Sequence, residues 1–325
     1  MLASPQNLRE STSMAVDPLS DALTLTRAHC VISGGLSAAG AWAVRLRPLT
    51  QLRLIAVVHG SCRLTIEGVE RPIRLGEGDV FVLNGSQPAV IGSELSVEAV
   101  ELNQLFPDHP GGMVHLSRER EVVCVGGHVA LDRTGEDLFL AALPPLTHIR
   151  AEAAEAPHLQ RLLDQLLREM TSHRPGADFA KDHHAQLLLV EVLRSSLADP
   201  NSFPAGWLRV LTDERLAPAL RLMHAEPSRA WALEELATAA AMSRTTFAAR
   251  FKKTAGLPPL TYLHHWRIRK AERALREEDI TVAALAASLG YASVSAFSNA
   301  FKRTKGISPR RYRDTTRGLL AAGES

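Results

Sequence analysis

The chain has 325 residues, enough for two domains that each bury a core of their own. With 46% hydrophobic and 22% charged residues, its composition excludes a disordered protein. Its three cysteines are far apart, which excludes a disulfide framework and a Cys-rich zinc site. It contains no apolar run of about eighteen residues and no secretory signal pattern, so we expect a cytoplasmic protein without a membrane span.

The net charge of +2 is distributed unevenly along the chain. Residues 207–323 hold 20 Lys and Arg against 10 Asp and Glu, whereas the remaining residues hold 17 against 25. A basic C-terminal part beside an acidic remainder indicates a nucleic-acid-binding module attached to a regulatory body. The alternative is a basic face that only keeps the protein in solution.

The chain begins with residues 1–16, which are polar and aperiodic and are expected to be disordered. Residues 17–29 follow with a pattern typical of a short helix. Asp17 is placed to cap this helix, and Leu19, Leu23 and Leu25 give it a partial apolar face.

Between about residue 40 and residue 102 the hydrophobic period changes to two. Short β-rich runs alternate here with Gly, Pro and Asn, and several such strands at close spacing predict a small antiparallel barrel or jelly roll. The most specific run is LGEGDVFVLNG (75–85), a glycine turn, an Asp able to bond the turn backbone, and a buried strand.

That run resembles the second half of the cupin signature, which implies a cupin-like domain over 17–150. A metal-binding cupin would place two His and a Glu on the first strand of its signature and a third His after the second strand, the one that follows the glycine turn. Here His59 stands alone near the first strand, and Pro88 or Ala89 occupies the later position. The resemblance therefore implies the barrel without a metal or other cofactor, and His59 is expected to be a strand-end or pocket histidine.

Residues 151–200 return to helical spacing and predict a helical hairpin broken at HRPGAD (173–178). The hairpin can cap the open side of the barrel or pair with a second subunit, and we favour a homodimer. The sequence ADPNSFPAGW begins a linker that we place at 201–212.

The C-terminal part contains one unit twice, at 233–262 and 282–312. When the two copies are aligned, with one residue inserted in the second, the first match is Leu236 with Leu285 and the last is Tyr262 with Tyr312. Between them the copies share Phe, basic, Thr, Gly and Pro residues at equivalent positions. Each copy has the pattern of a helix-turn-helix, over 232–253 and 281–303. The helix anchors are two Phe side chains four residues apart in each copy: Phe247, Phe251, Phe297 and Phe301.

Basic pairs follow the anchors at the same place in both copies. Lys252–Lys253 and Lys302–Arg303 are expected to contact DNA phosphates, which give affinity and register but no sequence choice. The spacer 260–276 has neither Gly nor Pro and predicts one helix of about 26 Å. Successive major-groove segments lie about 34–36 Å apart, so bent DNA would meet both units. The alternative is a helical protein-interaction domain.

Residues 213–317 resemble the DNA-binding domain of the AraC/XylS family, and GYASVSAFSNAFKRTKGISPRRYR (290–313) is close to that family's signature. Residues 318–325 form a tail. The resemblance implies an α+β protein with a cupin-like barrel and helical hairpin before an all-α domain of two helix-turn-helix units joined by a long helix. At the position of Ala249 the family often has an Arg, and Arg244 is the nearby residue that can substitute for it. Carried over by position, the resemblance implies base contacts from seven residues: Arg244, Thr245, Ala248, Ala249, Ser295, Ala296 and Asn299.

The resemblance implies a DNA-binding transcription regulator, an activator that works with RNA polymerase and senses a signal through its N-terminal domain. The signal is a small ligand in the barrel or oxidation of Cys30 and Cys124, which match positions in oxidant-sensing relatives; inert buried cysteines are the alternative. Two other functions stay open at this point: a cupin-type enzyme with an appended interaction domain, and a nonspecific DNA binder.

Overall fold

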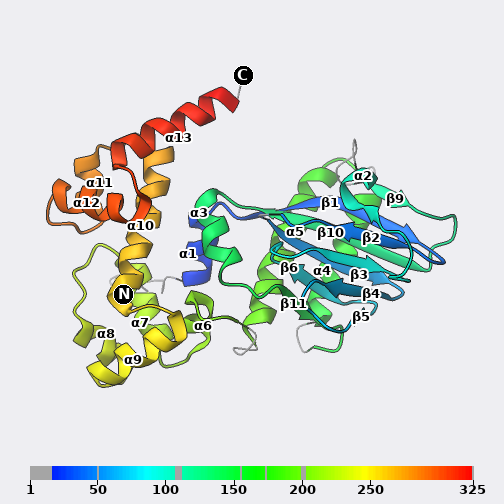
Figure 1. The fold of residues 1–325 in the computed structure, drawn as a ribbon, viewed down its shortest axis with the longest axis horizontal. Helices are drawn as coiled ribbons and strands as arrows, with labels where there is room; N and C mark the ends of the chain where they lie inside the picture. The colour runs from blue at the N-terminus through cyan, green and yellow to red at the C-terminus, as the bar shows by residue number, and fades with distance from the viewer. Residues whose placement is uncertain are drawn as a thin grey trace, which may run out of the picture. The chain divides into compact units, whose positions relative to one another are not determined.

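The computed structural model describes residues 17–49, 51–106, 112–153, 156–172, 174–198 and 203–323. The expected disordered segment 1–16 lies outside these residues. The fold is α+β, as the sequence predicts, with a sheet-rich N-terminal unit and an all-α C-terminal unit (Figure 1). Within the described residues no helix combines the length and the apolar character that crossing a membrane requires.

The two units are compact by their contacts. The N-terminal unit holds Leu23–Asp213 and Lys253–Gly256. The C-terminal unit holds Glu214–Lys252, the described residues from Leu257 onward, and the start of the first helix as far as Ala22.

The N-terminal unit is built on two sheets, and most neighbouring strands run antiparallel. The six-stranded sheet has the order β11-β6-β3-β10-β1-β9, from β1 (His29–Ala38), β3 (Leu52–His59), β6 (Val80–Leu83), β9 (Met113–His115), β10 (Val122–Ala130) and β11 (Leu146–Ile149). The five-stranded sheet has the order β5-β4-β7-β2-β8, from β2 (Ala43–Leu46), β4 (Cys62–Ile66), β5 (Ile73–Leu75), β7 (Ala89–Gly92) and β8 (Val100–Glu101).

One apolar core lies between these sheets. It joins Leu36 and Phe81 of the first sheet to Leu64 and Ile91 of the second. The glycine turn before β6 forms as predicted, since Asp79 accepts a hydrogen bond from the Gly76 N–H at 2.9 Å. Sequence periodicity predicts strands only between 40 and 102, and the structure adds β1, β9, β10 and β11.

Helices flank the sheets. The predicted first helix is confirmed as α1 (Pro18–Leu25), and Asp17 caps it by accepting hydrogen bonds from the N–H groups of Leu19 and Ser20 at 3.1 and 3.3 Å. The hairpin consists of α4 (Ala156–Thr171) and α5 (Ala177–Leu197), and α5 contacts β1 and β11. The apolar stripe of the hairpin is therefore buried within the chain, against the sheet and between the two helices. The shorter helices of this unit are α2 (Leu102–Leu105), α3 (Arg133–Gly135) and a π-helical turn at Glu136–Leu140.

Part of the segment expected to be a linker is ordered. Residues Trp207–Thr212 form α6, and the Trp207 ring packs edge-on against Phe139 with 5.7 Å between centroids. Its indole N–H donates to the Leu138 carbonyl at 3.3 Å. A buried Trp in this position outweighs the local Pro and Gly content, which is what makes the segment look like a linker in sequence.

The C-terminal unit follows the duplicated pattern of its sequence. After α7 (Ala217–Ala225), the first copy gives a short helix, a turn and a longer helix, and the second copy repeats them. The helices are α8 (Leu233–Ala239), α9 (Arg244–Ala255), the connecting α10 (Pro259–Glu277), α11 (Val282–Ser288), α12 (Val294–Lys305) and α13 (Pro309–Gly323). The predicted tail from residue 318 continues the backbone of α13 as far as Gly323.

Candidate DNA-binding surface and effector pocket

Two pairs of Phe side chains fix α9 and α12 in place. Phe247, Phe251, Phe297 and Phe301 are each 0% exposed. Their ring centroids lie 5.7 Å apart in the first copy and 5.8 Å apart in the second. The second ring of each pair meets a Tyr edge-on, Phe251 on Tyr262 at 5.8 Å and Phe301 on Tyr312 at 5.3 Å. All four side chains therefore lie on the buried faces of their helices.

Caps set where each outward-facing helix begins and ends. Ser293 accepts a hydrogen bond from the Ala296 N–H at 3.1 Å, and Ser243 accepts one from the Thr246 N–H at 3.3 Å. At the far ends Gly256 and Gly306 both have φ of 79°, a left-handed conformation in which glycine has no steric penalty. The same start and stop signals therefore give the same helix twice.

A buried polar cluster supports the first copy. His224 is 2% exposed, with Nδ1 3.1 Å from Asp21 and Nε2 2.7 Å from the Tyr262 hydroxyl. Burial lowers the pKa of His224, so the neutral ring donates to the carboxylate and accepts from the hydroxyl. Its ring lies 4.0 Å from that of Trp266 on α10. Sequence reasoning misses this cluster because Asp21 and His224 are 203 positions apart.

The outward faces carry the predicted base-contacting residues. Arg244, Thr245 and Ala249 are exposed on α9, and Ala248 is half-buried. Arg244 forms an ion pair with Glu234 of α8 at 2.9 Å, so it must leave that partner to reach a base. On α12, the exposed residues are Ser295, Ala296 and Asn299. Six of the seven residues are therefore exposed on two helices, and the second helix carries the Asn299 amide.

The basic pairs lie beside those faces. Lys252, Lys253, Lys302 and Arg303 are all exposed, and in the part of the chain that the structure describes none of them forms an ion pair with a carboxylate. Lys305 differs, because it binds Glu272 of α10 at 2.8 Å. Unpaired cations at equivalent positions in two copies are suited to phosphate contacts.

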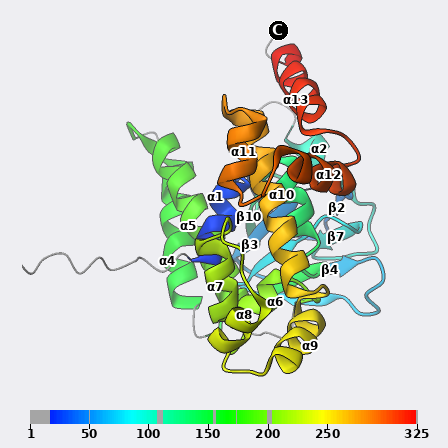
Figure 2. The same ribbon diagram turned by 90° about the vertical axis from the view of Figure 1, so that its left-hand side faces the viewer.

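The helix α10 separates the two copies. Its 19 residues correspond to about 28 Å at 1.5 Å per residue. Both views show α10 running between the α8–α9 pair and the α11–α12 pair (Figures 1 and 2). Its buried residues include Trp266, Ile268 and Leu275, so both copies pack on one continuous helix.

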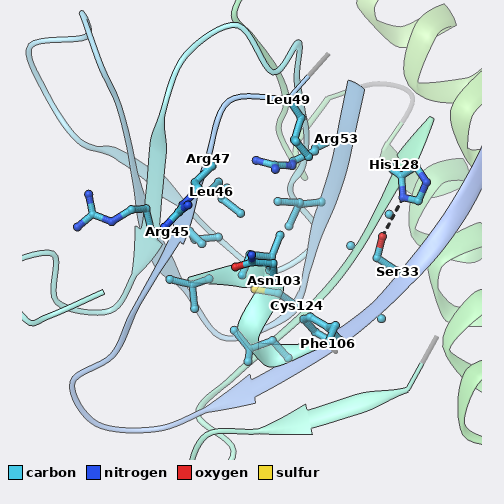
Figure 3. Close-up of a pocket in the computed structure, with 18 of the residues that line it drawn as sticks. Ser33, Arg45, Leu46, Arg47, Leu49, Arg53, Asn103, Phe106, Cys124 and His128 are labelled. Carbon is cyan, nitrogen blue, oxygen red and sulfur yellow. Dashed lines mark hydrogen bonds between the residues drawn. The ribbon is translucent and has the colours of Figure 1, made fainter. Parts of the chain in front are cut away.

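The N-terminal unit contains a cavity of about 320 Å³ between its two sheets. Leu36, Val44, Leu46 and Ile91 form apolar walls, and Arg53, His128 and Cys124 also line it (Figure 3). His59 lies outside this cavity, at the end of β3, where it contacts Glu77 at 3.0 Å. The described residues include no group of three or more His, Cys, Asp or Glu side chains arranged to hold a metal.

The three cysteines are buried and have different neighbours. The neighbouring Cys62 thiol, together with burial, raises the pKa of Cys124. Burial alone raises the pKa of Cys30 to about 12. In the β1–β10 register Cys30 faces Val129 whereas Cys124 faces Leu36, six positions along β1, or about 20 Å. Cys62, which the sequence did not single out, is therefore the neighbour of Cys124.

Comparison with known proteins agrees with this architecture. The cupin family matches residues 17–198, and a helix-turn-helix domain family matches residues 236–315. A putative AraC-like transcription regulator from Streptomyces lividans is 38% identical over 299 residues, covering 92% of this chain and 98% of the relative. The RCS-specific HTH-type transcriptional activator RclR of Escherichia coli is 33% identical over 232 residues, covering 66% of this chain and 80% of the relative.

Among solved structures, the DNA-binding domain of AdpA in complex with a target DNA is 33% identical, covering 33% of this chain and 96% of that one, with a TM-score of 0.32. The Streptomyces lividans relative, which matches over nearly its whole length, is named a putative AraC-like transcription regulator, and the helix-turn-helix family matches the part of this chain that contains both copies. The chain belongs to the AraC family of DNA-binding transcription regulators, with a cupin domain ahead of its helix-turn-helix domain, and is not an enzyme.

Proposed function

We propose that this regulator binds a specific DNA sequence by placing α9 and α12 in successive major grooves on one side of the duplex. The observation that carries the proposal is the pair of outward faces mounted on one rigid helix. The length of α10, about 28 Å, is shorter than the 34–36 Å between groove segments, so the bound DNA is bent toward the protein.

The two copies contribute unequally to base reading in this proposal. Asn299 is exposed and its amide can pair bidentately with adenine. The first copy offers Thr245 and the methyl groups of Ala248 and Ala249, which suit contact with thymine methyl groups. Arg244 contributes only after releasing Glu234. We therefore infer that α12 supplies most of the sequence choice and that α9 mainly sets position.

A matched pair of substitutions tests this division of roles. Asn299→Ala should cost about 1–3 kcal/mol at one base pair and relax the preference there, because it removes a base-edge contact. Lys302→Ala should weaken binding to every sequence and reduce the slope of log K against log salt by about 1, because it removes a phosphate contact. Binding-site selection from random DNA and salt titrations measure the two effects.

Lys181→Ala is the charge control, because Lys181 lies on α5 in the N-terminal unit and pairs with Asp178 at 2.9 Å. It should leave both affinity and salt slope unchanged. If selection enriches no motif with the wild-type chain, the protein is a nonspecific DNA binder and the proposal fails. If Asn299→Ala leaves the motif intact, base reading lies elsewhere.

We further propose that the protein is an activator that contacts RNA polymerase in the cytoplasm, with its signal received by the N-terminal unit. The name of the E. coli relative, a transcriptional activator, supports the direction of regulation. Transcription in vitro with purified RNA polymerase and a selected operator tests it. A template that gives less transcript when the protein is added would identify a repressor.

Oxidation is one candidate signal, and the nearness of the Cys62 and Cys124 thiols supports this pair as the one that would be oxidised. Oxidation of Cys62 and Cys124 by a peroxide would join their sulfur atoms, with two electrons and two protons passing to the peroxide. Cys124 lines the cavity, which gives a small oxidant a route to it. We predict that Cys62→Ser or Cys124→Ser abolishes an oxidant response in a promoter assay while Cys30→Ser retains it. An unchanged response in both variants of the pair would eliminate oxidation as the signal.

We propose a homodimer through the outward face of α5. Phe179 and Leu187 remain 71% and 53% exposed there, and the centroid of the His183 ring lies 4.1 Å from that of Phe179. The helix face that periodicity assigned to pairing is buried within the chain, so a dimer needs this second face. Phe179→Ser with Leu187→Ser should halve the mass measured by light scattering. If the wild-type chain already has the mass of a monomer in this measurement, the dimer proposal is wrong.

A further inference from the structure

One end of the cavity holds a buried cation without a counter-ion. Arg53 is 8% exposed on β3, and Figure 3 shows its side chain extending over the pocket near Arg47 and Leu49. Within the described part of the chain no carboxylate forms an ion pair with Arg53. Burial lowers the pKa of its guanidinium below the ordinary value, yet an arginine remains charged near neutral pH. A buried unpaired charge costs several kcal/mol, so this end of the cavity is suited to an anion from outside the chain.

The surroundings of Arg53 add polar groups of the right kind. His128 is its direct partner in the β3–β10 register, and Ser33 Oγ lies 3.1 Å from His128 Nδ1. Burial, with the nearby charges of His29 and Arg53, lowers the pKa of His128 and keeps the ring neutral. Arg53 and a neutral imidazole therefore share one end of the cavity, and both can donate hydrogen bonds to the same anion.

The two other arginines of the cavity already have a partner. Glu101 lies 3.6 Å from Arg45 and 2.8 Å from Arg47. Figure 3 shows the Arg45 side chain turned away from the pocket. Arg53 is therefore the unpaired positive charge among the lining residues that the structure describes, and one positive charge is balanced by a monoanion.

The rest of the wall is apolar. Leu36, Val44, Leu46, Ile55 and Ile91 are each less than 10% exposed and face the cavity from both sheets. A volume of 320 Å³, at about 30 Å³ for each small non-hydrogen group, holds about ten such groups. Polar or multiply charged molecules would lose hydration against these walls without gaining partners.

We propose that the cavity binds a small amphipathic monoanion of about ten non-hydrogen atoms in all, with an apolar body and one carboxylate that pairs with Arg53. This inference names the chemical class of the effector and so rests on the proposed regulatory function. The fork of the guanidinium matches the two carboxylate oxygens, and the apolar walls hold the body of the ligand. Affinity then comes from the walls, and preference for the acid comes from Arg53.

Calorimetric titration of the full chain, without DNA, tests the inference with two pairs of probes. Octanoate is compared with octan-1-ol, and 4-methylbenzoate with 4-methylbenzyl alcohol, so that an extended and a flat body are both sampled. At least one acid should bind about 10- to 100-fold more tightly than its alcohol, the range for a hydrogen-bonded contact to a charged group. Arg53→Met should remove this preference while keeping the affinity for the alcohol, which also shows that the cavity is intact.

Two further variants separate charge from space. Arg63→Met removes an exposed arginine of β4 that does not line the cavity, and it should change nothing. Gly126→Val fills the cavity, since a Cβ at Gly126 meets only Ile55 Cγ1 at 3.5 Å and the Leu54 carbonyl oxygen at 3.7 Å. It should weaken acid and alcohol alike. The proposal is overturned if neither acid binds the wild type, if acid and alcohol bind equally, or if Arg53→Met retains the preference.

Measuring the affinity of the same variants for operator DNA distinguishes a failure of the effector proposal from a failure of the proposed regulatory function. Arg53→Met and Gly126→Val should still bind the selected operator, but the acid should no longer change their affinity for it. Loss of acid binding with normal operator binding would remove only the effector class. A wild-type chain that binds the acid but selects no operator would instead contradict the proposed function.

Discussion

Phe301→Ala should lower the free energy of unfolding of the C-terminal unit by about 3–5 kcal/mol, the cost of truncating a fully buried Phe, and should abolish operator binding. Phe301 is 0% exposed and lies in a cluster with Phe297, Leu285 and Ile268. Its edge-on contact with Tyr312 adds about 0.5–1.5 kcal/mol that Ala cannot replace. Because Phe301 holds α12 in place, its loss displaces Asn299 and Lys302 together.

Urea unfolding of the full chain, with hydrogen exchange followed in α10 to α13, measures the effect in the right unit. Val294→Ala is the control on the same helix, because Val294 is 42% exposed; it should cost less than about 0.5 kcal/mol. Phe251→Ala should reproduce the Phe301 result in α8 and α9, since Phe251 has the same burial and the same Tyr contact. An α12 that keeps its exchange protection in Phe301→Ala would show that the anchor is dispensable.

The C-terminal unit is the part of the molecule that its sequence predicts best. Helix caps, helix stops and the Phe pairs four residues apart are local signals that can be read from a few neighbouring residues. Because the unit is duplicated, each of these signals occurs twice in the sequence. The structure accordingly gives Phe247 and Phe297 the same burial, and Gly256 and Gly306 the same φ, in the two copies. A polar cluster that the sequence does not reveal there, Asp21 with His224, joins residues that are 203 positions apart.

The sheets were predicted only in part, for a physical reason. Strands β4 and β6 carry an alternating or fully apolar pattern between clear turns, whereas β1 and β10 contain glycines and have a single exposed residue between them, His29. A strand in which polar and apolar residues do not alternate lacks the two-residue hydrophobic period by which a strand is predicted from sequence. The missed strands are those that bring Ser33, His128 and Cys124 to the cavity, so neither the cavity nor its charge could be assigned before the register was known.

The cysteine prediction also fails to identify a neighbour that only the strand pairing reveals. Sequence resemblance selected Cys30 and Cys124, but a disulfide requires Cα atoms within about 7 Å. The β1–β10 register separates these two, and the packing of β4 against β10 places Cys62 by Cys124 instead. Which cysteines are neighbours depends on long-range strand pairing, which resemblance at isolated positions does not supply.

Gly290→Ala should destabilise the C-terminal unit by about 2–4 kcal/mol, from backbone strain and a steric clash added together. Gly290 has φ of 76°, in the left-handed region, within the turn between α11 and α12. A Cβ there would lie 1.8 Å from the Ser228 carbonyl oxygen and 2.6 Å from its carbon. That backbone cannot easily withdraw, because Arg267 of α10 donates hydrogen bonds to the flanking carbonyls of Pro227 and Arg229.

The first copy supplies the reciprocal change. Ala241 occupies the equivalent turn with φ of 51°, and the N–H groups that follow it and Gly290 bond back in the same way, Met242 to Ala237 and Tyr291 to Ala286, both at 3.0 Å. Ala241→Gly should therefore stabilise the unit by up to about 1 kcal/mol, since relief of left-handed strain exceeds the added freedom of the unfolded chain. Denaturant midpoints of both single variants measure the pair. Because the two substitutions are reciprocal, left-handed strain predicts effects of opposite sign, and destabilisation by both variants would show that this strain does not decide stability at Ala241. A Gly290→Ala effect no larger in size than that of Ala241→Gly would show that the close approach to Ser228 adds nothing.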